Sequence, residues 1–196
     1  MKFPKRSFWL LLAPILLVAM LLANQVVISA RQQAAIREIE RLGGRVLTTH
    51  SEPDWLRRLA GNRTFRVFEK STVVNLSETA ITDAELVHLA DLNGLERLNL
   101  NETEITDTGL EQLETLTGLK ALDLSGTQIT GKGLKHLANL TKLEYLYLAG
   151  TQVGNGDLPQ LYGLSMLRHL DVAGTAVTDE GVEQIDRQLP NVQVKR

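Results

Sequence analysis

The feature that most limits how this chain can fold is an internal repeat of 24 residues. Threonine returns at this interval at Thr79, Thr103, Thr127, Thr151 and Thr175. Five columns of apolar residues keep the same spacing across residues 74–185. Apolar residues make up only 43% of the chain, so columns filled in every unit do not arise by chance. A period of this length indicates similar units stacked side by side, each burying its neighbour's apolar residues.

Each unit changes its periodicity partway along. Leu98 and Leu100 alternate with the polar Asn99, which is typical of a short strand. Leu110 and Leu113 are three residues apart, as on one face of a helix. The sequence therefore predicts one strand and one short helix in every unit.

The segment between strand and helix contains residues suited to helix capping. Thr82 and Glu85 fit a capping box, in which the hydroxyl accepts from a helix-start amide and the carboxylate accepts in return. Three further threonines are expected to cap in the same way: Thr106, Thr130 and Thr178. The fourth unit has Gly154 and Pro159 in this region, which predicts a helix that starts late or is irregular.

Two other recurring positions have structural explanations. The repeated threonine follows the strand, so its hydroxyl is expected to bond backbone groups of the buried turn. A recurring glycine, at Gly109, Gly133 and Gly181, is replaced by Glu85 and Asp157 in the other units. Because acidic residues are accepted there, close packing rather than a positive φ is expected to explain the glycines.

The unit reads L-x-x-L-x-L-x-x-T-x-[IV]-T-D-x-G-L-x-x-L-x-x-L and resembles the leucine-rich repeat. It is most similar to the subtype with ITDxGL segments found in bacterial repeat proteins and in the repeat part of F-box proteins. The resemblance covers residues 71–196 and implies an α/β solenoid with a parallel concave sheet and short convex helices. It also implies that proteins or other ligands bind the concave face. Residues 1–70 contain no recognisable F-box, so the membrane-anchored bacterial type is the closer analogy.

The N-terminal segment is apolar. No charged residue lies between Arg6 and Arg31, and as a helix this stretch is about 36 Å long, enough to cross a hydrocarbon core of about 30 Å. We expect residues 1–30 to form a cytoplasmic tail and a transmembrane signal-anchor, with the repeats on the extracytoplasmic side of the membrane. The alternatives are a signal peptide cleaved after Ala23 or Ala30 and a helix buried in the core.

Residues 31–70 are expected to cap the first repeat, because terminal repeats need a cover for their apolar side. The pattern predicts a helix over 31–42 that ends at Gly43 and Gly44, a strand over 45–49 and a short helix over 53–60. A ligand site is the alternative explanation for four residues of this segment: His50, Trp55, Arg57 and Arg58. Residues 71–196 are expected to hold five repeats and a C-terminal edge strand.

Composition excludes several classes of function. The chain has no cysteine, which rules out disulfides, cysteine-bound metals and thiol catalysis. Residues 71–196 contain nine basic and eighteen acidic side chains, a net charge of −9, which makes nucleic acid a poor partner. An open repeat surface excludes little water and offers no evident nucleophile. The sequence therefore predicts no enzyme, catalytic residue, cofactor or metal site.

Strand side chains that flank the buried leucines are expected to face out on the concave side. At a strand spacing of about 4.8 Å, Tyr145 is expected beside His169, and Tyr147 between Asp123 and Asp171. The candidate partner-binding residues are Tyr145, Tyr147, His169, Asp171, Asp123, Arg97 and Asn99. The expected function is a membrane-anchored module that binds a protein or peptide on this face. The alternative is a self-associating structural protein of the cell envelope without a discrete ligand.

Overall fold

The computed structural model describes residues 6–50, 69–92 and 94–196, without the side chains of residues 6–19, 21–22, 50 and 69. The expected helix over 53–60 and the alternative site of His50, Trp55, Arg57 and Arg58 therefore lie outside the described residues.

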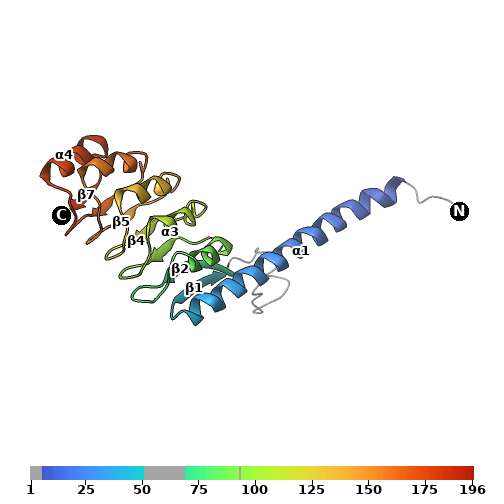
Figure 1. Ribbon diagram of the computed structural model, residues 1–196. Coiled ribbons are helices and arrows are strands. Elements are labelled where there is room, and N and C mark those ends of the chain that lie inside the picture. The colour runs from blue at the N-terminus through green and yellow to red at the C-terminus, as the bar shows by residue number, and fades with distance from the viewer. Residues whose placement is uncertain (1–5, 51–68, 93) are drawn as a thin grey trace.

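One continuous helix, α1 (Arg6–Arg41), joins the apolar N-terminal stretch to the helix predicted over 31–42. Its N-terminal part extends away from the repeats (Figure 1). The helix ends at Arg41. Gly43 in the following turn has a φ of +88°, and the Gly44 N–H bonds the Ile39 carbonyl at 2.9 Å. Among the residues that the structure describes, no helix combines the length and the apolar character needed to traverse a bilayer. Most side chains of the expected signal-anchor lie outside that described set.

The strands form one seven-stranded open sheet in sequence order. β1 and β2 are antiparallel, and every later pair is parallel. The predicted register holds: Val74, Leu98, Leu122, Leu146 and Leu170 lie side by side on successive strands. The strands are β1 (Arg45–His50), β2 (Glu69–Asn75), β3 (Arg97–Asn99), β4 (Ala121–Asp123), β5 (Tyr145–Tyr147), β6 (His169–Asp171) and β7 (Gln193–Lys195).

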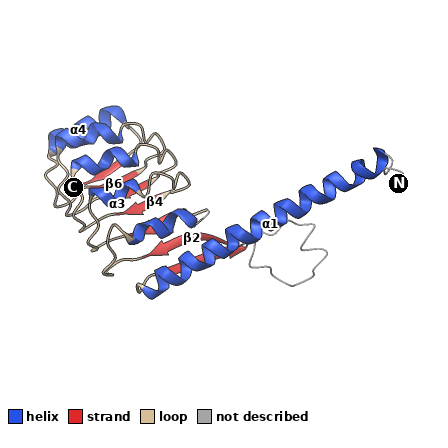
Figure 2. Ribbon diagram, turned by 45° about the vertical axis from the view of Figure 1, so that its right-hand side comes forward, coloured by secondary structure: helices blue, strands red, loops and turns tan. Residues whose placement is uncertain are grey.

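Short helices lie along one face of the sheet (Figure 2). They are η2 (Glu85–Asp91), α3 (Asp107–Glu111), η3 (Gly131–Leu137), η4 (Asn155–Leu161) and α4 (Asp179–Gln188). Three of them are 3₁₀ helices, a form that suits pieces of one or two turns. The expected late start of the fourth helix is wrong. η4 begins at Asn155, 24 residues after Gly131, and its irregularity is the 3₁₀ geometry with Pro159 inside it.

The core lies between sheet and helices. The leucine columns are buried, and Leu110, Leu122 and Leu134 are completely inaccessible. The C-terminal part of α1 closes the N-terminal end of this core with Ile36 and Ile39. Burial of each such side chain contributes roughly 1.5–3 kcal/mol, so the columns dominate the stability of the stack.

The repeated threonines form a ladder inside the turn after each strand. Each hydroxyl donates to the carbonyl three residues earlier, at 2.5–2.6 Å. Thr103, Thr127 and Thr151 are buried, whereas Thr79 and Thr175 at the two ends are half-buried. The predicted role of the threonine hydroxyl is confirmed.

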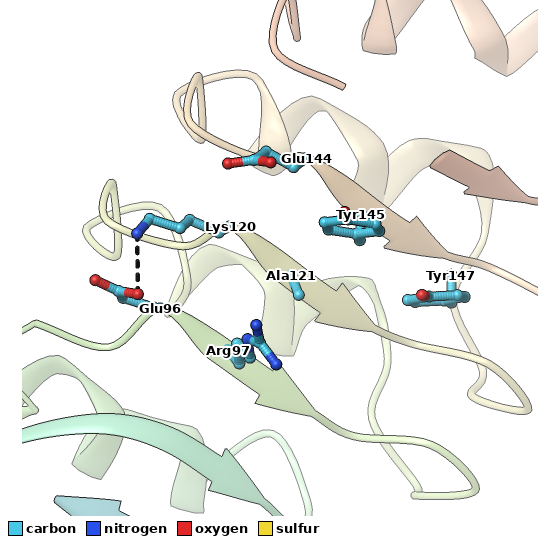
Figure 3. A pocket seen from close by; sticks show the side chains of 7 residues that line it. All are labelled: Glu96, Arg97, Lys120, Ala121, Glu144, Tyr145 and Tyr147. Carbon is cyan, nitrogen blue, oxygen red and sulfur yellow. Dashed lines mark hydrogen bonds and ion pairs between the residues drawn. The ribbon is translucent and has the colours of Figure 1, made fainter. Parts of the chain in front are cut away.

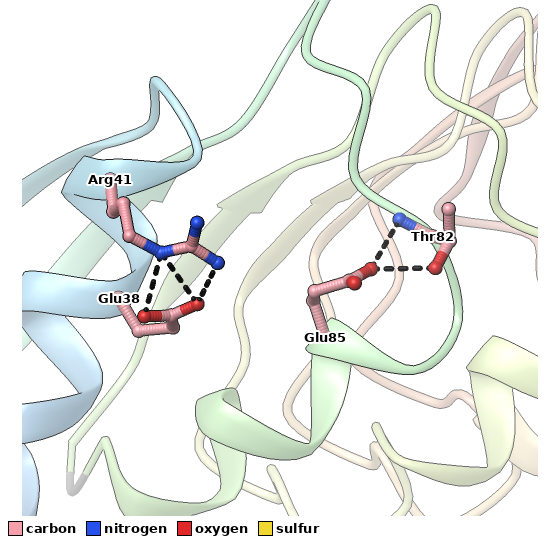
Figure 4. A network of polar contacts seen from close by, with 4 residues as sticks. All are labelled: Glu38, Arg41, Thr82 and Glu85. Atoms are coloured by element: carbon pink, nitrogen blue, oxygen red, sulfur yellow. Dashed lines mark hydrogen bonds and ion pairs between the residues drawn. The ribbon is translucent and has the colours of Figure 1, made fainter.

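The helix starts follow the capping prediction only in part. Thr106 and Thr130 accept from the amides of Thr108 and Lys132 as expected. The hydroxyl and the N–H of Thr82 both donate to the Glu85 carboxylate, which keeps the pKa of Glu85 below its ordinary value, so half of the capping box forms (Figure 4). The prediction for Thr178 is wrong, because its hydroxyl donates to Glu180 and caps no amide.

A carboxylate or amide from the preceding repeat supports three of these starts. Asp107 accepts from the Thr130 N–H at 2.8 Å and from its hydroxyl at 2.6 Å. Asp83 binds Thr106 in the same way, and Asn155 takes this role toward Thr178. The recurring glycines make room for these groups, since a Cβ on Gly133 would lie 2.4 Å from Asp107 Oδ1. The packing explanation for the glycines is therefore confirmed.

Candidate functional site

The strand side chains that point away from the core form an open surface, which we call the strand face. Val73, Arg97, Ala121, Tyr145 and His169 stand side by side in one row, and Asn75, Asn99, Asp123, Tyr147 and Asp171 in a second. Both rows follow from the two-residue alternation of the strands, which turns the intervening leucine inward. The seven predicted site residues therefore all belong to these two rows.

A hollow of about 370 Å³ lies on this face over Ala121. Arg97 and Tyr145 border it from the strands on either side of β4, and Tyr147 closes one end (Figure 3). Tyr145 is 42% exposed. The methyl group of Ala121 is the reason for the hollow, because the neighbouring positions carry long side chains.

A second hollow of about 260 Å³ adjoins the first and shares Arg97, Ala121 and Tyr147 with it. Its border also includes Asn99 and Asp123. The two hollows thus bring together five of the seven predicted residues, from three neighbouring strands.

The aromatic residues are arranged partly as expected. Tyr145 is the register partner of His169, and Tyr147 lies between Asp123 and Asp171. The closest ring contact, however, is diagonal: the ring centroids of Tyr147 and His169 are 5.4 Å apart with the planes tilted by 51°. This contact fixes the orientation of Tyr147, while Tyr145 stays open to solvent.

Asp171 has a structural role and is not open to a partner. It is 5% exposed, its Oδ1 accepts from the Ala173 N–H at 3.0 Å, and its Oδ2 accepts from Lys195 Nζ at 2.8 Å. Burial raises the pKa of Asp171, but the bonds from Lys195 and Ala173 lower it by more, so the net pKa lies below its ordinary value. Asp171 is thus buried and already paired, unlike the exposed Tyr145.

Asn99 and Asp123 make the same turn-closing hydrogen bond as Asp171. Each accepts a hydrogen bond from the N–H two residues later, at Asn101 and Ser125, and so closes the turn after its strand. The other side-chain oxygen of Asp123 has no hydrogen bond within the described residues. Both residues remain partly exposed, so they can border the hollow and close the turn together.

A row of alternating charges, which the sequence analysis did not predict, lies along the edge of the strand face where the strands begin. We call this edge the rim. Glu96, Lys120, Glu144 and Arg168 precede successive strands. Lys120 Nζ lies 3.0 Å from Glu96 Oε2, and Arg168 Nε lies 3.4 Å from Glu144 Oε2. The 24-residue spacing of these four residues was the signal that could have revealed them, because it places opposite charges on adjacent strands.

Within the described parts of the chain, no group of three or more histidine or acidic residues is placed to hold a metal ion. The polar groups around the two hollows are a guanidinium, an ammonium group, two phenols, two amides and carboxylates. This set can form hydrogen bonds and ion pairs with a polypeptide and can cover apolar groups.

Comparison with known proteins agrees with the repeat pattern. Leucine rich repeat family models match residues 93–153 and residues 163–185. No curated protein shows significant sequence similarity to the chain.

Similar solved structures include a leucine-rich repeat protein of Leptospira interrogans, at 22% identity and a TM-score of 0.45 over 56% of this chain and 27% of that one. An internalin from Listeria monocytogenes matches at 20% identity and a TM-score of 0.42 over 63% of this chain and 39% of its own. The Chaetomium Mex67:Mtr2 subunits match at 18% identity and a TM-score of 0.40 over 46% and 69%. The chain thus spans well under half of the length of the first two proteins.

The family matches fall on the units that the 24-residue period defines, and those units form parallel strands and short helices in an open sheet. The chain thus contains leucine-rich repeats, matched over residues 93–153 and 163–185.

Proposed function

We propose that this chain is an interaction module that binds a protein or peptide partner on its strand face, over Ala121. Leucine-rich repeats commonly mediate protein interactions and are typically not enzymes. The observation that carries the proposal is the hollow of about 370 Å³ beside the 42% exposed Tyr145. A tyrosine at the edge of a hollow offers apolar area and a hydroxyl group, the combination favoured in binding hot spots.

Tyr145 and Tyr147 have different parts in this proposal. Tyr147 is held against His169 and gives the hollow a fixed wall. Tyr145 has no ring contact among the described residues and can settle onto a partner. Because Tyr147 is already fixed, only the Tyr145 side chain loses conformational entropy when a partner binds, while both rings contribute contact area.

The test is a binding assay with a partner captured by the full chain in detergent micelles. Replacing Tyr145 or Tyr147 by alanine is expected to weaken affinity by about 10-fold or more, as for a hot-spot residue. Val87→Ala is the matched control, because Val87 is 51% exposed on the helix side. Binding that is insensitive to both tyrosines but lost in Val87→Ala would contradict the proposal and favour association through the helices, as in a self-associating envelope protein.

We further propose that residues 7–30 anchor the chain in a membrane, with the short basic tail inside and the repeats on the extracytoplasmic side. The absence of charge over this stretch supports the proposal. Exposed apolar residues on the free part of α1 support it as well, with Met20 at 72% and Val26 at 54%.

The absence of cysteine allows a direct test of anchoring and orientation. Single Lys5→Cys and Asp179→Cys variants are treated with a membrane-impermeant maleimide in intact cells. Asp179, with an 81% exposed side chain, is expected to react at once, and Lys5→Cys only after permeabilisation. The reverse pattern would contradict the orientation, and release of the chain from membranes by alkaline washing would contradict the anchor.

A further inference from the structure

Arg97 and Arg45 are exposed basic residues of the strand face that have no ion pair within the described residues, but of the two only Arg97 borders the hollows. Lys120 and Arg168 on the rim pair with Glu96 and Glu144, and Lys195 pairs with Asp171. Arg97, also exposed, has neither an ion pair nor a hydrogen bond within the described residues.

The unpaired guanidinium of Arg97 lies at the edge of the proposed binding surface, on the β3 side of Ala121. It borders both hollows, and the small Ala121 separates it from Tyr145 (Figure 3). A group bound over Ala121 would therefore contact Arg97 on one side and an aromatic ring on the other.

The surroundings leave the charge of Arg97 available to a ligand. Glu96 is held by Lys120 and Glu144 by Arg168. Asp123, which borders the second hollow with Arg97, accepts from the Ser125 N–H and forms no ion pair with Arg97 within the described residues. A guanidinium forms two parallel hydrogen bonds with a carboxylate, which gives both strength and direction. The net charge of −9 over residues 71–196 disfavours a polyanion such as nucleic acid, which would carry many phosphates across the acidic surface.

We infer that the site selects a polypeptide segment that presents one aspartate or glutamate next to an apolar residue. The carboxylate pairs with Arg97, and the apolar side chain lies over Ala121 against the ring of Tyr145. This inference rests on the proposed binding function and adds the chemistry of the partner.

The probe is a random 12-residue peptide library displayed on phage, selected against the immobilised full chain in detergent micelles. The expected result is enrichment of an acidic residue beside an apolar one. Arg97→Glu is expected to reverse the preference to lysine or arginine and to weaken peptides selected on the original chain by at least 10-fold. Tyr145→Ala is expected to abolish the apolar preference and keep the acidic one.

Two control variants separate the possible failures. Arg187→Glu changes a charge of the same kind on α4, where Arg187 pairs with Glu183, and is expected to leave selection unchanged. Peptides that need Tyr145 but show no acidic preference and tolerate Arg97→Glu would overturn this inference and leave the binding function intact. Peptides indifferent to both residues, a failure to enrich any peptide, or equal loss in Arg187→Glu would overturn both. Preferential capture of a single-stranded oligonucleotide over the acidic peptides would also overturn the choice of a polypeptide partner.

Discussion

At the scale of the residue, position in the stack decides what the same side chain contributes. The five repeated threonines make the same bond to the carbonyl three residues earlier. Only the inner three are buried, because each has a repeat on both sides. Water can replace a lost hydroxyl at the ends of the ladder but not inside it.

Replacing Thr127 by valine tests this difference. The change keeps the shape and removes the 2.5 Å bond to the Leu124 carbonyl, so the free energy of unfolding is expected to fall by about 1 kcal/mol. Thr79→Val removes the equivalent bond to the Leu76 carbonyl at the half-buried end and is expected to cost less than half as much. Urea denaturation midpoints measure both changes, and equal losses would contradict the account.

The Asp171–Lys195 pair predicts a dependence on pH. The folded pKa of Asp171 lies below its ordinary value, so its stabilising effect is present above the unfolded pKa of about 3.9 and disappears as pH falls through the folded pKa. At pH 7 we expect Asp171→Asn to lower the free energy of unfolding by about 1 kcal/mol. The difference between the two proteins should close below about pH 4 in urea titrations. A difference that persists unchanged at pH 3 would indicate a shape effect in place of a charge effect.

At the scale of the element, each helix start is bonded either by a carboxylate or amide of the preceding repeat or by an acid at its own third position. Asp107 supplies Thr130, and the third position of that helix is Gly133. In the fourth repeat the glycine and the acid exchange places. Gly131 stands in the preceding repeat at the position equivalent to Asp107, and Asp157 at the third helix position accepts from the Gly154 N–H at 2.9 Å. The two solutions exclude each other, since a Cβ on Gly131 would lie 1.8 Å from Asp157 Cγ.

This exclusion can be measured with a double-mutant cycle. Gly131→Asp alone is expected to destabilise the fold by about 2 kcal/mol or more because of the clash, and Asp157→Gly alone by about 1 kcal/mol through loss of the cap. The double variant recreates the arrangement of the third repeat, so its loss is expected to be smaller than that of Gly131→Asp alone. Losses that simply add in urea midpoints would show that the two positions are independent.

The sequence predicted the strands, their register and one short helix in every repeat, because these follow from apolar columns at a fixed spacing, but it misplaced the start of the fourth helix. It could not distinguish 3₁₀ from α geometry, which depends on small differences over five to seven residues. It also gave no sign of what Asp83 and Asp107 bind. Their actual partners, Thr106 and Thr130, are 23 residues away, and only the stacked structure brings them together.

At the scale of the whole molecule, the C-terminal part of α1 covers the N-terminal end of the repeat stack. Ile39 is 1% exposed in the same core as the leucine columns, and buried Gln32 donates to Ser71 Oγ at 3.1 Å. Because repeats contact mainly their neighbours, damage at this end is expected to remain local.

Ile39→Ala tests this locality. The cavity is expected to cost about 2–4 kcal/mol, and amide hydrogen exchange should accelerate in β2 and η2. Exchange in β6 and α4 should change little. Uniform acceleration along the chain would show that the molecule opens as a single cooperative unit.

The candidate site was predictable where it depends on strand register alone. Alternation placed Arg97, Tyr145 and Tyr147 on one face, and the structure brings them to one hollow. It gave no sign that Asp171 is buried by Lys195, because that depends on how the last strand covers its neighbour. The Glu96–Lys120 rim was missed because those residues precede the strands and have no buried leucine on both sides.

The unbroken course of α1 has a mechanical consequence. α1 runs as one helix from Arg6 to Arg41, and its Gln32 bonds Ser71 of β2. A rotation or tilt of the outer end of α1 is therefore expected to move the first strands of the sheet with it. If the outer half of α1 is replaced by another helix that continues it without a break, the strand face should take a fixed orientation relative to that helix. Each residue inserted at the junction should rotate the strand face about the helix axis by about 100°.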